Sequence, residues 1–264
     1  MAPVSYLIVP GSFATPALYD DLVALLHKQG HNVRAISLPS ANDGTRLPAP
    51  TAADDAAHIR EELTALLDHE TTPSDVLLLL HSYAGVPGSS AVQGLGRSDR
   101  ALQAKATAVV GIVYLASFLL PLGMSNRRFL ITHKAMPDDV AAGVAGGYLP
   151  PIDPAFAPFL FNDVPDEAER ARLLGLMTQH SSDSYDGAVA YEAFKHIPSV
   201  SIIPGNDLIV PTRLQELMYE AVATDGNVSR VFVEGAGHCL NNSRPDIVAA
   251  EMVKLAESQA VHDT

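Results

Sequence analysis

The sequence predicts an α/β protein: a mostly parallel sheet of about six strands, helices on both faces and an inserted helical cap. Three observations predict this class. Short aliphatic runs alternate with helix-length segments along most of the chain, which is typical of parallel sheets. The alternation is interrupted once, by a long proline-rich stretch. Polar residues whose side chains can take part in catalysis follow directly after several of the predicted strands.

The first half of the chain alternates regularly. We expect strands at 4–9, 32–37, 76–81 and 109–117, and helices at 16–29, 54–68 and from about 84. Gly30 is well placed to end the first helix. Asp54 and Asp55 lie at the amino end of the second helix, where the helix dipole favours carboxylates.

The pattern changes between 119 and 196, where prolines divide the chain into short stretches, among them a predicted helix at 165–179. This stretch either packs on itself or covers the carboxyl edge of the sheet and encloses an apolar pocket. We favour the cap, because two strands whose ends carry candidate site residues flank it. The predicted organisation is therefore a core of residues 1–118 and 197–264, with a cap at 119–196. The core resumes with strands at 199–203 and 228–233 and ends with a helix at 245–258.

Ser82 is the candidate nucleophile. It follows the buried strand at 76–81 and precedes a helix, as in the G-x-S-x-G elbow that lifts a serine hydroxyl clear of a sheet. The match is incomplete, because Leu80 and Ala84 occupy the two glycine positions and Gly85 comes one residue late. An ordinary turn after a core strand is the alternative.

Asp207 and His238 are the candidate partners of Ser82. A nucleophilic serine needs a general base, and the base needs an orienting carboxylate. Asp207 follows the strand at 199–203 and His238 follows the strand at 228–233, in the order along the chain that this kind of site requires. Both therefore belong to the edge where open α/β sheets place their sites.

Other acids and histidines compete less well. Asp183 and Asp186 do not follow a core strand. His81 adjoins the candidate nucleophile, and we expect it to be packed or hydrogen-bonded. His180 and His196 lie in the inserted stretch and are candidates for lining a pocket.

An oxyanion hole requires two backbone donors. The N–H of Tyr83, the residue after the nucleophile, is the first. The second is expected from the loop after the first strand, where Gly11 allows the chain to bend and the Ser12 N–H follows. Such a donor lowers a barrier by about 2.7–4 kcal/mol. A plain turn is the alternative for this loop.

Composition narrows the possible partners. A chain of 264 residues favours one large domain. Its net charge of −13 argues against nucleic acid and anionic membranes as partners. The single cysteine, Cys239, excludes an internal disulfide and fits a reducing compartment. The sequence has no metal-ligand spacing and no phosphate-binding loop, and we expect neither a signal peptide nor a membrane-spanning stretch. We expect a cytoplasmic monomer or homodimer without a metal or cofactor.

Six short motifs, in order, carry a family resemblance. They are Val-Pro-Gly-Ser (9–12), Gly-His-Asn-Val (30–33), Leu-Pro-Ser (38–40), His-Ser-Tyr-Ala-Gly (81–85), Asp-Leu-Ile-Val-Pro (207–211) and Gly-Ala-Gly-His (235–238). The chain resembles the α/β-hydrolase superfamily, in particular the small capped esterases that include plant methyl esterases and hydroxynitrile lyases, and related fungal hydrolases. The resemblance implies the α/β-hydrolase fold. It assigns the triad to Ser82, Asp207 and His238, and the oxyanion donors to Ser12 and Tyr83.

The same resemblance separates ester hydrolysis from cyanohydrin cleavage. The lyases of this group carry a threonine in the oxyanion loop and a lysine after the catalytic histidine, whose positive charge suits a cyanide leaving group. Gly11 and Cys239 occupy the matching positions here. Cyanohydrin cleavage is therefore not expected.

The sequence predicts a serine hydrolase that cleaves small apolar carboxylic esters or lactones through an acyl-serine intermediate. The expected pocket residues are Phe13, Phe118, Leu119, Met124, Phe129, Phe159 and Leu208. Two alternatives remain open. One is carbon–carbon bond hydrolysis, or a cyclisation or elimination step of secondary metabolism, in the same pocket. The other is a non-catalytic protein that binds a small molecule, to which only Leu80 points.

Overall fold

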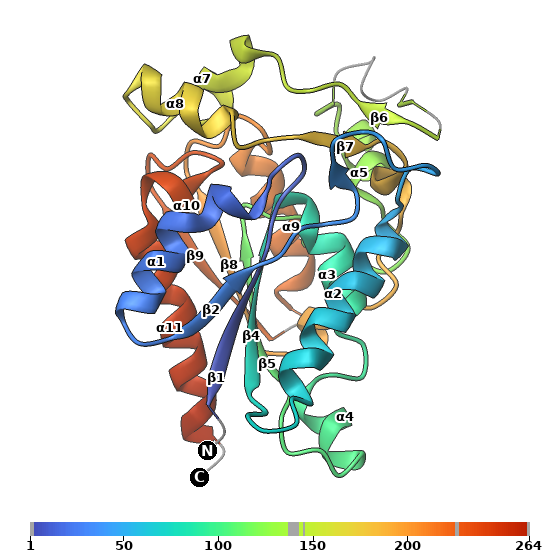
Figure 1. The fold of residues 1–264 in the computed structure, drawn as a ribbon, viewed down its shortest axis with the longest axis vertical. Coiled ribbons are helices and arrows are strands. Elements are labelled where there is room, and N and C mark those ends of the chain that lie inside the picture. Colours follow the sequence, from blue (N-terminus) through green and yellow to red (C-terminus); the bar gives the residue numbers. More distant parts are fainter. Residues whose placement is uncertain (1–2, 137–142, 145, 225–226, 263–264) are drawn as a thin grey trace.

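Six parallel strands form the central sheet of the computed structural model, which describes residues 3–136, 143–144, 146–224 and 227–262 (Figure 1). Their spatial order is β2-β1-β4-β5-β8-β9. The strands are β1 (Val4–Val9), β2 (Asn32–Ala35), β4 (Asp75–His81), β5 (Val109–Leu115), β8 (Ser199–Pro204) and β9 (Val228–Val233). This architecture confirms the predicted fold class.

Every residue of the two central strands, β4 and β5, is buried. Strands of a parallel sheet are covered on both faces, which is why these two are almost continuously aliphatic. Side chains alternate between two core clusters: Leu78 and Leu80 face one, and Leu77 and Leu79 face the other. The sheet thus separates two hydrophobic layers.

Helices cover each layer (Figure 1). One layer contains α1 (Asp20–Lys28) and α11 (Pro245–His262), which contact each other. The opposite layer contains α2 (Ala52–Leu67), α3 (Gly85–Ala91) and α9 (Thr212–Val222). Further short helices of the core are η1 (Pro16–Tyr19), η2 (Ser82–Ala84), α4 (Arg97–Leu102) and α10 (Leu240–Ser243). None of the helices in the described residues is long and apolar enough to cross a membrane.

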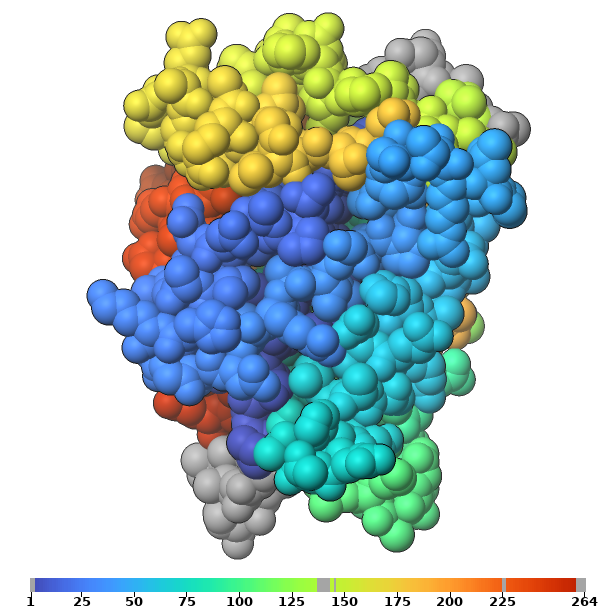
Figure 2. All heavy atoms as spheres, in the orientation of Figure 1, coloured from blue at the N-terminus to red at the C-terminus, as the bar shows by residue number. Residues whose placement is uncertain are grey.

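The segment between β5 and β8, which we call the inserted segment, lies over the carboxyl edge of the sheet (Figure 1). It packs directly on residues of the first 50 positions, shown in blue in Figure 2. Its described elements are α5 (Asn126–Thr132), β6 (Tyr148–Leu149), η3 (Pro154–Phe156), α7 (Ala157–Leu160), α8 (Glu167–Leu174), β7 (Gln179–Ser181), η4 (Asp183–Asp186) and η5 (Ala193–Lys195).

The inserted segment is only partly helical. Strands β6 and β7 form a small antiparallel sheet with β3 (Ala41–Asn42), a strand contributed by the core. The helix predicted at 165–179 was too long, because it ends at Leu174 and the chain then pairs with β3 through β7. Pairing with a strand distant in sequence is invisible to local periodicity.

The two adjacent carboxylates at the start of α2 lie in different environments. Asp54 completes a capping box with Thr51, the residue that precedes the helix. Asp55 is instead fully buried and accepts hydrogen bonds from Ser40 and Tyr83. The helix-dipole interpretation therefore describes the environment of Asp54, whereas Asp55 belongs to the interior.

Leu80, one of the two residues that depart from the elbow motif, is accommodated by a glycine on the following helix. A Cβ atom added to Gly88 would lie 2.2 Å from Cδ2 of Leu80, far inside van der Waals contact. Leu80 is completely buried, so its side chain would have to shift within a packed core to make room for that atom. The space that the motif normally obtains from a glycine on the strand is thus obtained here from a glycine on α3.

We predict that Gly88→Ala lowers the free energy of unfolding by about 1–3 kcal/mol, because the new methyl group overpacks the core against Leu80. Combining it with Leu80→Ala should recover part of that loss, so that the two substitutions are not additive. Urea denaturation of the two single variants and the double variant measures this coupling. A fully additive cycle would show that the two side chains do not share the space.

Candidate active site

Three side chains from three different strand ends meet at the carboxyl edge of the sheet. The Oγ of Ser82 lies 3.0 Å from Nε2 of His238, and Nδ1 of His238 lies 2.8 Å from Oδ2 of Asp207. All three residues are buried. The structure thus brings together the nucleophile, base and acid candidates that the sequence singled out.

Ser82 occupies a strained turn. Its φ of 54° lies in the left-handed region, which costs a residue other than glycine on the order of 1–3 kcal/mol. Its carbonyl oxygen accepts hydrogen bonds from the Phe118 N–H (3.1 Å) and the Ser117 hydroxyl (2.8 Å), which lie just beyond β5. These contacts help to hold the turn between β4 and α3 in a conformation that the isolated chain would avoid.

The hydrogen bonds of Asp207 fix the tautomer of His238. Oδ1 accepts the N–H groups of Ile209 (2.8 Å) and Val210 (2.9 Å), and Oδ2 accepts the side-chain amide of Gln215 (2.7 Å). An ionised carboxylate only accepts, so His238 carries its proton on Nδ1. Nε2 is then the acceptor that faces the Ser82 hydroxyl.

A buried chain of hydrogen bonds joins the loop after β1 to the backbone of His238. The Gly11 N–H donates to the Tyr19 hydroxyl (3.0 Å), which contacts Nδ1 of His81 (2.6 Å), whose Nε2 contacts the carbonyl of His238 (3.1 Å). Burial lowers the pKa of His81 to about 3, so its ring is neutral. The expectation that His81 is a hydrogen-bonded histidine is confirmed.

The inserted segment holds the two loops that carry Asp207 and His238. The side-chain amide of Asn162 donates to the carbonyl of Asn206 (2.8 Å), the residue before Asp207. Oδ2 of Asp163 accepts the N–H of Gly237 (2.8 Å), the residue before His238, and also the Ser243 hydroxyl. Neither residue could be singled out from the sequence, because the partners of Asn162 and Asp163 are more than 40 residues away.

The loop after β1 passes close to Ser82, the candidate nucleophile. A Cβ atom on Gly11 would lie 3.1 Å from Cβ of Ser82, so a larger residue would require Ser82 or the loop to shift by a few tenths of an ångström. Phe13 has a φ of 63°, and its N–H donates to Nδ1 of His180 (3.4 Å). Burial lowers the pKa of His180 to about 3. The neutral ring accepts on Nδ1 and donates on Nε2 to the Ser184 hydroxyl (3.0 Å).

Tyr83, the residue after Ser82, is anchored by Asp55. Its hydroxyl donates to Oδ2 of Asp55 (2.7 Å), and its ring packs edge-on against His180 with centroids 4.8 Å apart. Burial raises the pKa of Asp55, while its hydrogen bonds from Ser40 and Tyr83 oppose that shift. The position of the Tyr83 backbone therefore depends on a carboxylate from α2.

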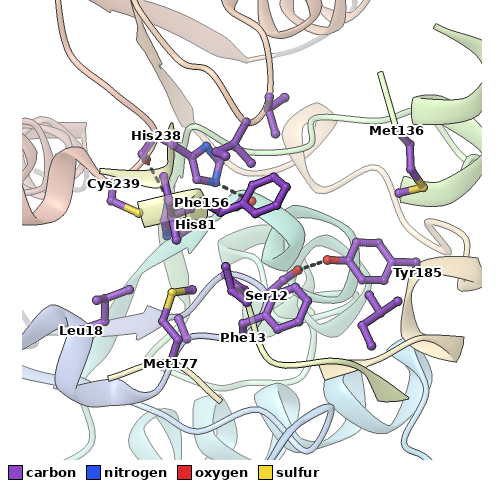
Figure 3. Close-up of a pocket in the computed structure, with 18 of the residues that line it drawn as sticks. Ser12, Phe13, Leu18, His81, Met136, Phe156, Met177, Tyr185, His238 and Cys239 are labelled. Atoms are coloured by element: carbon purple, nitrogen blue, oxygen red, sulfur yellow. Dashed lines mark hydrogen bonds between the residues drawn. The ribbon is translucent and has the colours of Figure 1, made fainter. Parts of the chain in front are cut away.

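A cavity of about 460 Å³ adjoins Ser82 and His238 (Figure 3). Phe13 and Phe118 line it, as the sequence predicted. The rest of its wall is mostly apolar and comes from both the core and the inserted segment; it includes Leu18, Leu130, Met136, Phe156, Met177, Tyr185, Ile209 and Val210. Neither His180 nor His196 is among the described lining residues.

Five of the expected pocket residues do not line this cavity. Leu119 and Phe129 are buried in the core, and Met124 packs against the same cluster. The side chains of Phe159 and Leu208 are about half exposed, and their neighbours Phe156 and Ile209 line the cavity instead. These corrections concern loops and short helices, where the facing of a side chain has no regular period.

Cys239 lines the cavity but does not resemble a nucleophile. Its side chain is buried, and burial raises the pKa of its thiol, which disfavours the reactive thiolate. Within the part of the chain that the structure describes, no three His, Cys, Asp or Glu side chains are grouped to hold a metal ion.

Comparison with known proteins identifies the family. The model of the alpha/beta hydrolase family matches residues 6–251. The chain belongs to the alpha/beta hydrolase family. Alpha/beta hydrolase nvfD of Aspergillus novofumigatus is 30% identical over 266 residues, covering 99% of each chain. Probable hydrolase R7 of Phoma sp. is 29% identical over 252 residues, covering 95% of this chain and 97% of that protein.

A plant structure shares the fold. Methylketone synthase I of tomato, solved in complex with 2-tridecanone, superposes with a TM-score of 0.72 at 16% sequence identity. The match covers 98% of this chain and 99% of that one. The resemblance to the α/β-hydrolase superfamily and to fungal hydrolases is thereby confirmed, and the plant structure confirms the fold.

We predict that Asp163→Ala destabilises the protein by about 1–3 kcal/mol, because it leaves the buried N–H of Gly237 without an acceptor. Asp163→Asn, which keeps one acceptor oxygen, should lose less. Urea denaturation measures the stability, and hydrogen exchange of the Gly237 amide measures the local effect. An unchanged exchange rate of the Gly237 amide in the alanine variant would show that Asp163 does not hold the loop before His238.

We predict that the free energy of unfolding falls as the pH drops from 6.5 towards 5. His81 and His180 stay neutral in the folded protein, whereas histidines of the unfolded chain bind protons near pH 6.5. A histidine whose pKa is lowered in the folded state contributes its full stabilisation above the unfolded-state pKa of about 6.5. This stabilisation is lost progressively as the pH falls below that value, because the unfolded chain then binds a proton that the folded protein does not. The slope approaches about 1.4 kcal/mol per pH unit for each histidine.

Urea denaturation across this pH range tests the prediction in the wild type, His180→Gln and His69→Gln. The first variant should show a shallower slope, because one buried histidine is gone. His69 is exposed and serves as the matched control. An identical slope in His180→Gln and the wild type would show that His180 does not exclude the proton.

Proposed function

We propose that the protein is a serine hydrolase that cleaves apolar carboxylic esters or lactones through an acyl-serine intermediate. The observation that carries this proposal is the continuous hydrogen-bonded chain from Asp207 through His238 to Ser82, opening on an apolar cavity. A serine, a neutral imidazole and a buried carboxylate in this order are the parts that acyl transfer requires.

In the acylation step, His238 takes the proton of the Ser82 hydroxyl through Nε2 as Oγ attacks the carbonyl carbon. Asp207 stabilises the imidazolium that forms and keeps the ring in place through its bond to Nδ1. His238 then gives the proton to the leaving alcohol as the carbon–oxygen bond of the ester breaks. Ser82 is left as the acyl ester.

In the deacylation step, His238 acts as base again and takes a proton from the attacking water. His238 then gives this proton to Oγ of Ser82 as the bond between the acyl carbon and Oγ breaks, and the carboxylic acid leaves. The negative oxygen of each tetrahedral intermediate is held by the backbone N–H groups of Ser12 and Tyr83. The approach of the Gly11 backbone to Ser82 and the anchoring of Tyr83 by Asp55 support this assignment.

The wall of the cavity supports an apolar substrate. Aliphatic, aromatic and thioether side chains dominate it, and such a surface favours ligands that leave water readily. Both fungal relatives bear the name hydrolase, and the tomato structure carries a long aliphatic ketone. Together these support hydrolysis of a substrate with an extended apolar portion.

We predict that a fluorescent fluorophosphonate labels Ser82 and that p-nitrophenyl esters are hydrolysed with a burst. Ser82→Ala should abolish labelling and reduce kcat by about 10⁴-fold or more, because the nucleophile is removed. Asp207→Asn should reduce kcat by roughly 10⁴-fold through the wrong tautomer of His238. Mass spectrometry of the labelled peptide and stopped-flow release of nitrophenol are the measurements.

Other outcomes would replace the proposal. A folded protein that binds apolar molecules without labelling or turnover would be a binding protein. Products of carbon–carbon cleavage, cyclisation or elimination from a wider substrate panel, without ester hydrolysis, would assign the site to that chemistry. Full ester turnover by Ser82→Ala would exclude the acyl-serine mechanism.

A further inference from the structure

Two hydroxyl groups that the proposed mechanism does not use form a pair on the wall of the cavity. The Tyr185 hydroxyl donates to Oγ of Ser12 at 2.7 Å, and both residues line the cavity (Figure 3). Ser12 belongs to the loop after β1, and Tyr185 belongs to η4 of the inserted segment. The pair therefore joins the two parts of the protein at the site itself.

One of the two hydroxyl protons of this pair is not used in the hydrogen bond between them. Two hydroxyls carry two protons, and their mutual bond uses one of them. Burial raises the pKa of Tyr185 to about 12, so the phenol remains a neutral donor. The Ser12 hydroxyl accepts from Tyr185, and the described residues provide no acceptor for its own proton. That proton is available to a molecule in the cavity.

Apart from the thiol of Cys239, which is only a weak donor, the other polar side chains on the described wall are already engaged. Ser82 and His238 are bonded to each other, and His81 contacts Tyr19 and the carbonyl of His238. Asp153, the remaining charged residue of the wall, accepts the Ala155 N–H and cannot donate as a carboxylate. Among the described residues of this largely apolar wall, the Ser12 hydroxyl is thus the O–H group whose proton has no partner within the protein.

The covalent geometry of Ser12 sets where this donor acts. Its Oγ is only three bonds from its own backbone nitrogen, the proposed oxyanion donor. An oxygen bound by the hydroxyl and an oxygen bound by the N–H must therefore lie close together, at hydrogen-bond distance from one residue. Two oxygens of one substrate meet this requirement when few carbon atoms separate the groups that carry them.

We propose that the Ser12 hydroxyl, oriented by Tyr185, binds a second acceptor oxygen in the acyl part of the substrate, near the scissile carbonyl. The substrate class is then an apolar ester or lactone with a keto, hydroxy or ether oxygen within a few atoms of that carbonyl. Ser12 acts as a binding residue through its side chain, and Tyr185 as a positioning residue. This inference rests on the proposed function.

The test compares p-nitrophenyl octanoate with p-nitrophenyl 3-oxaoctanoate, which differ by one ether oxygen in place of a methylene group. The wild type should prefer the oxa ester beyond its greater intrinsic reactivity. Ser12→Ala should lower the ratio of the two kcat/KM values by about three- to tenfold, the effect of one net hydrogen bond. Intrinsic reactivity cancels when this ratio is compared between variants.

Tyr185→Phe should lower the same ratio by a smaller factor, because the Ser12 hydroxyl is still present but no longer oriented. The double variant should lose no more than Ser12→Ala alone, since both act through one proton. Tyr191→Phe is the matched control: its ring stacks on His196 outside the described cavity wall, and the ratio should not change.

Each outcome separates the inference from the proposed function. An equal fall in both kcat/KM values, with an unchanged ratio, would show that the hydroxyls only support the oxyanion loop and would overturn the inference alone. A wild type that neither hydrolyses these esters nor reacts with the phosphonate would overturn the proposed function and the inference with it. Circular dichroism of each variant confirms the fold.

Discussion

The hydrogen bond between His238 and Asp207 is the interaction on which the rest of the site depends. It places the imidazole proton on Nδ1 and so leaves Nε2 to accept from Ser82. The three residues come from three strand ends, and a shift of about 1 Å at any of them would break the chain. Much of the surrounding structure has the physical effect of preventing such shifts.

The inserted segment is part of that support as well as a cover. Asn162 and Asp163 tie the loops before Asp207 and His238, while His180 and Tyr185 tie the loop that carries Ser12 and Phe13. A segment bonded to every one of these loops cannot move as a whole without disturbing the site. The segment therefore both lines the cavity and helps to align the three candidate catalytic groups.

Much of the fold and the central three residues could be predicted from the sequence, because strand ends in a parallel sheet converge. Ser82, Asp207 and His238 each follow an aliphatic run, and the topology brings such positions together. Asp55, Asp163 and Tyr185 could not be found in this way. Their partners are fixed by tertiary packing, and a buried carboxylate on a helix has the same local pattern as an exposed one. That Gly88 leaves room for the side chain of Leu80 could not be predicted from the sequence for the same reason.

A crystal structure of the protein after reaction with a fluorophosphonate tests the central claim most directly. We expect a covalent bond from Ser82 Oγ to phosphorus, with the phosphonyl oxygen about 2.7–3.1 Å from the N–H groups of both Ser12 and Tyr83. The bond between His238 and Asp207 should remain intact. An adduct on another residue, or a phosphonyl oxygen turned away from these two N–H groups, would contradict the account.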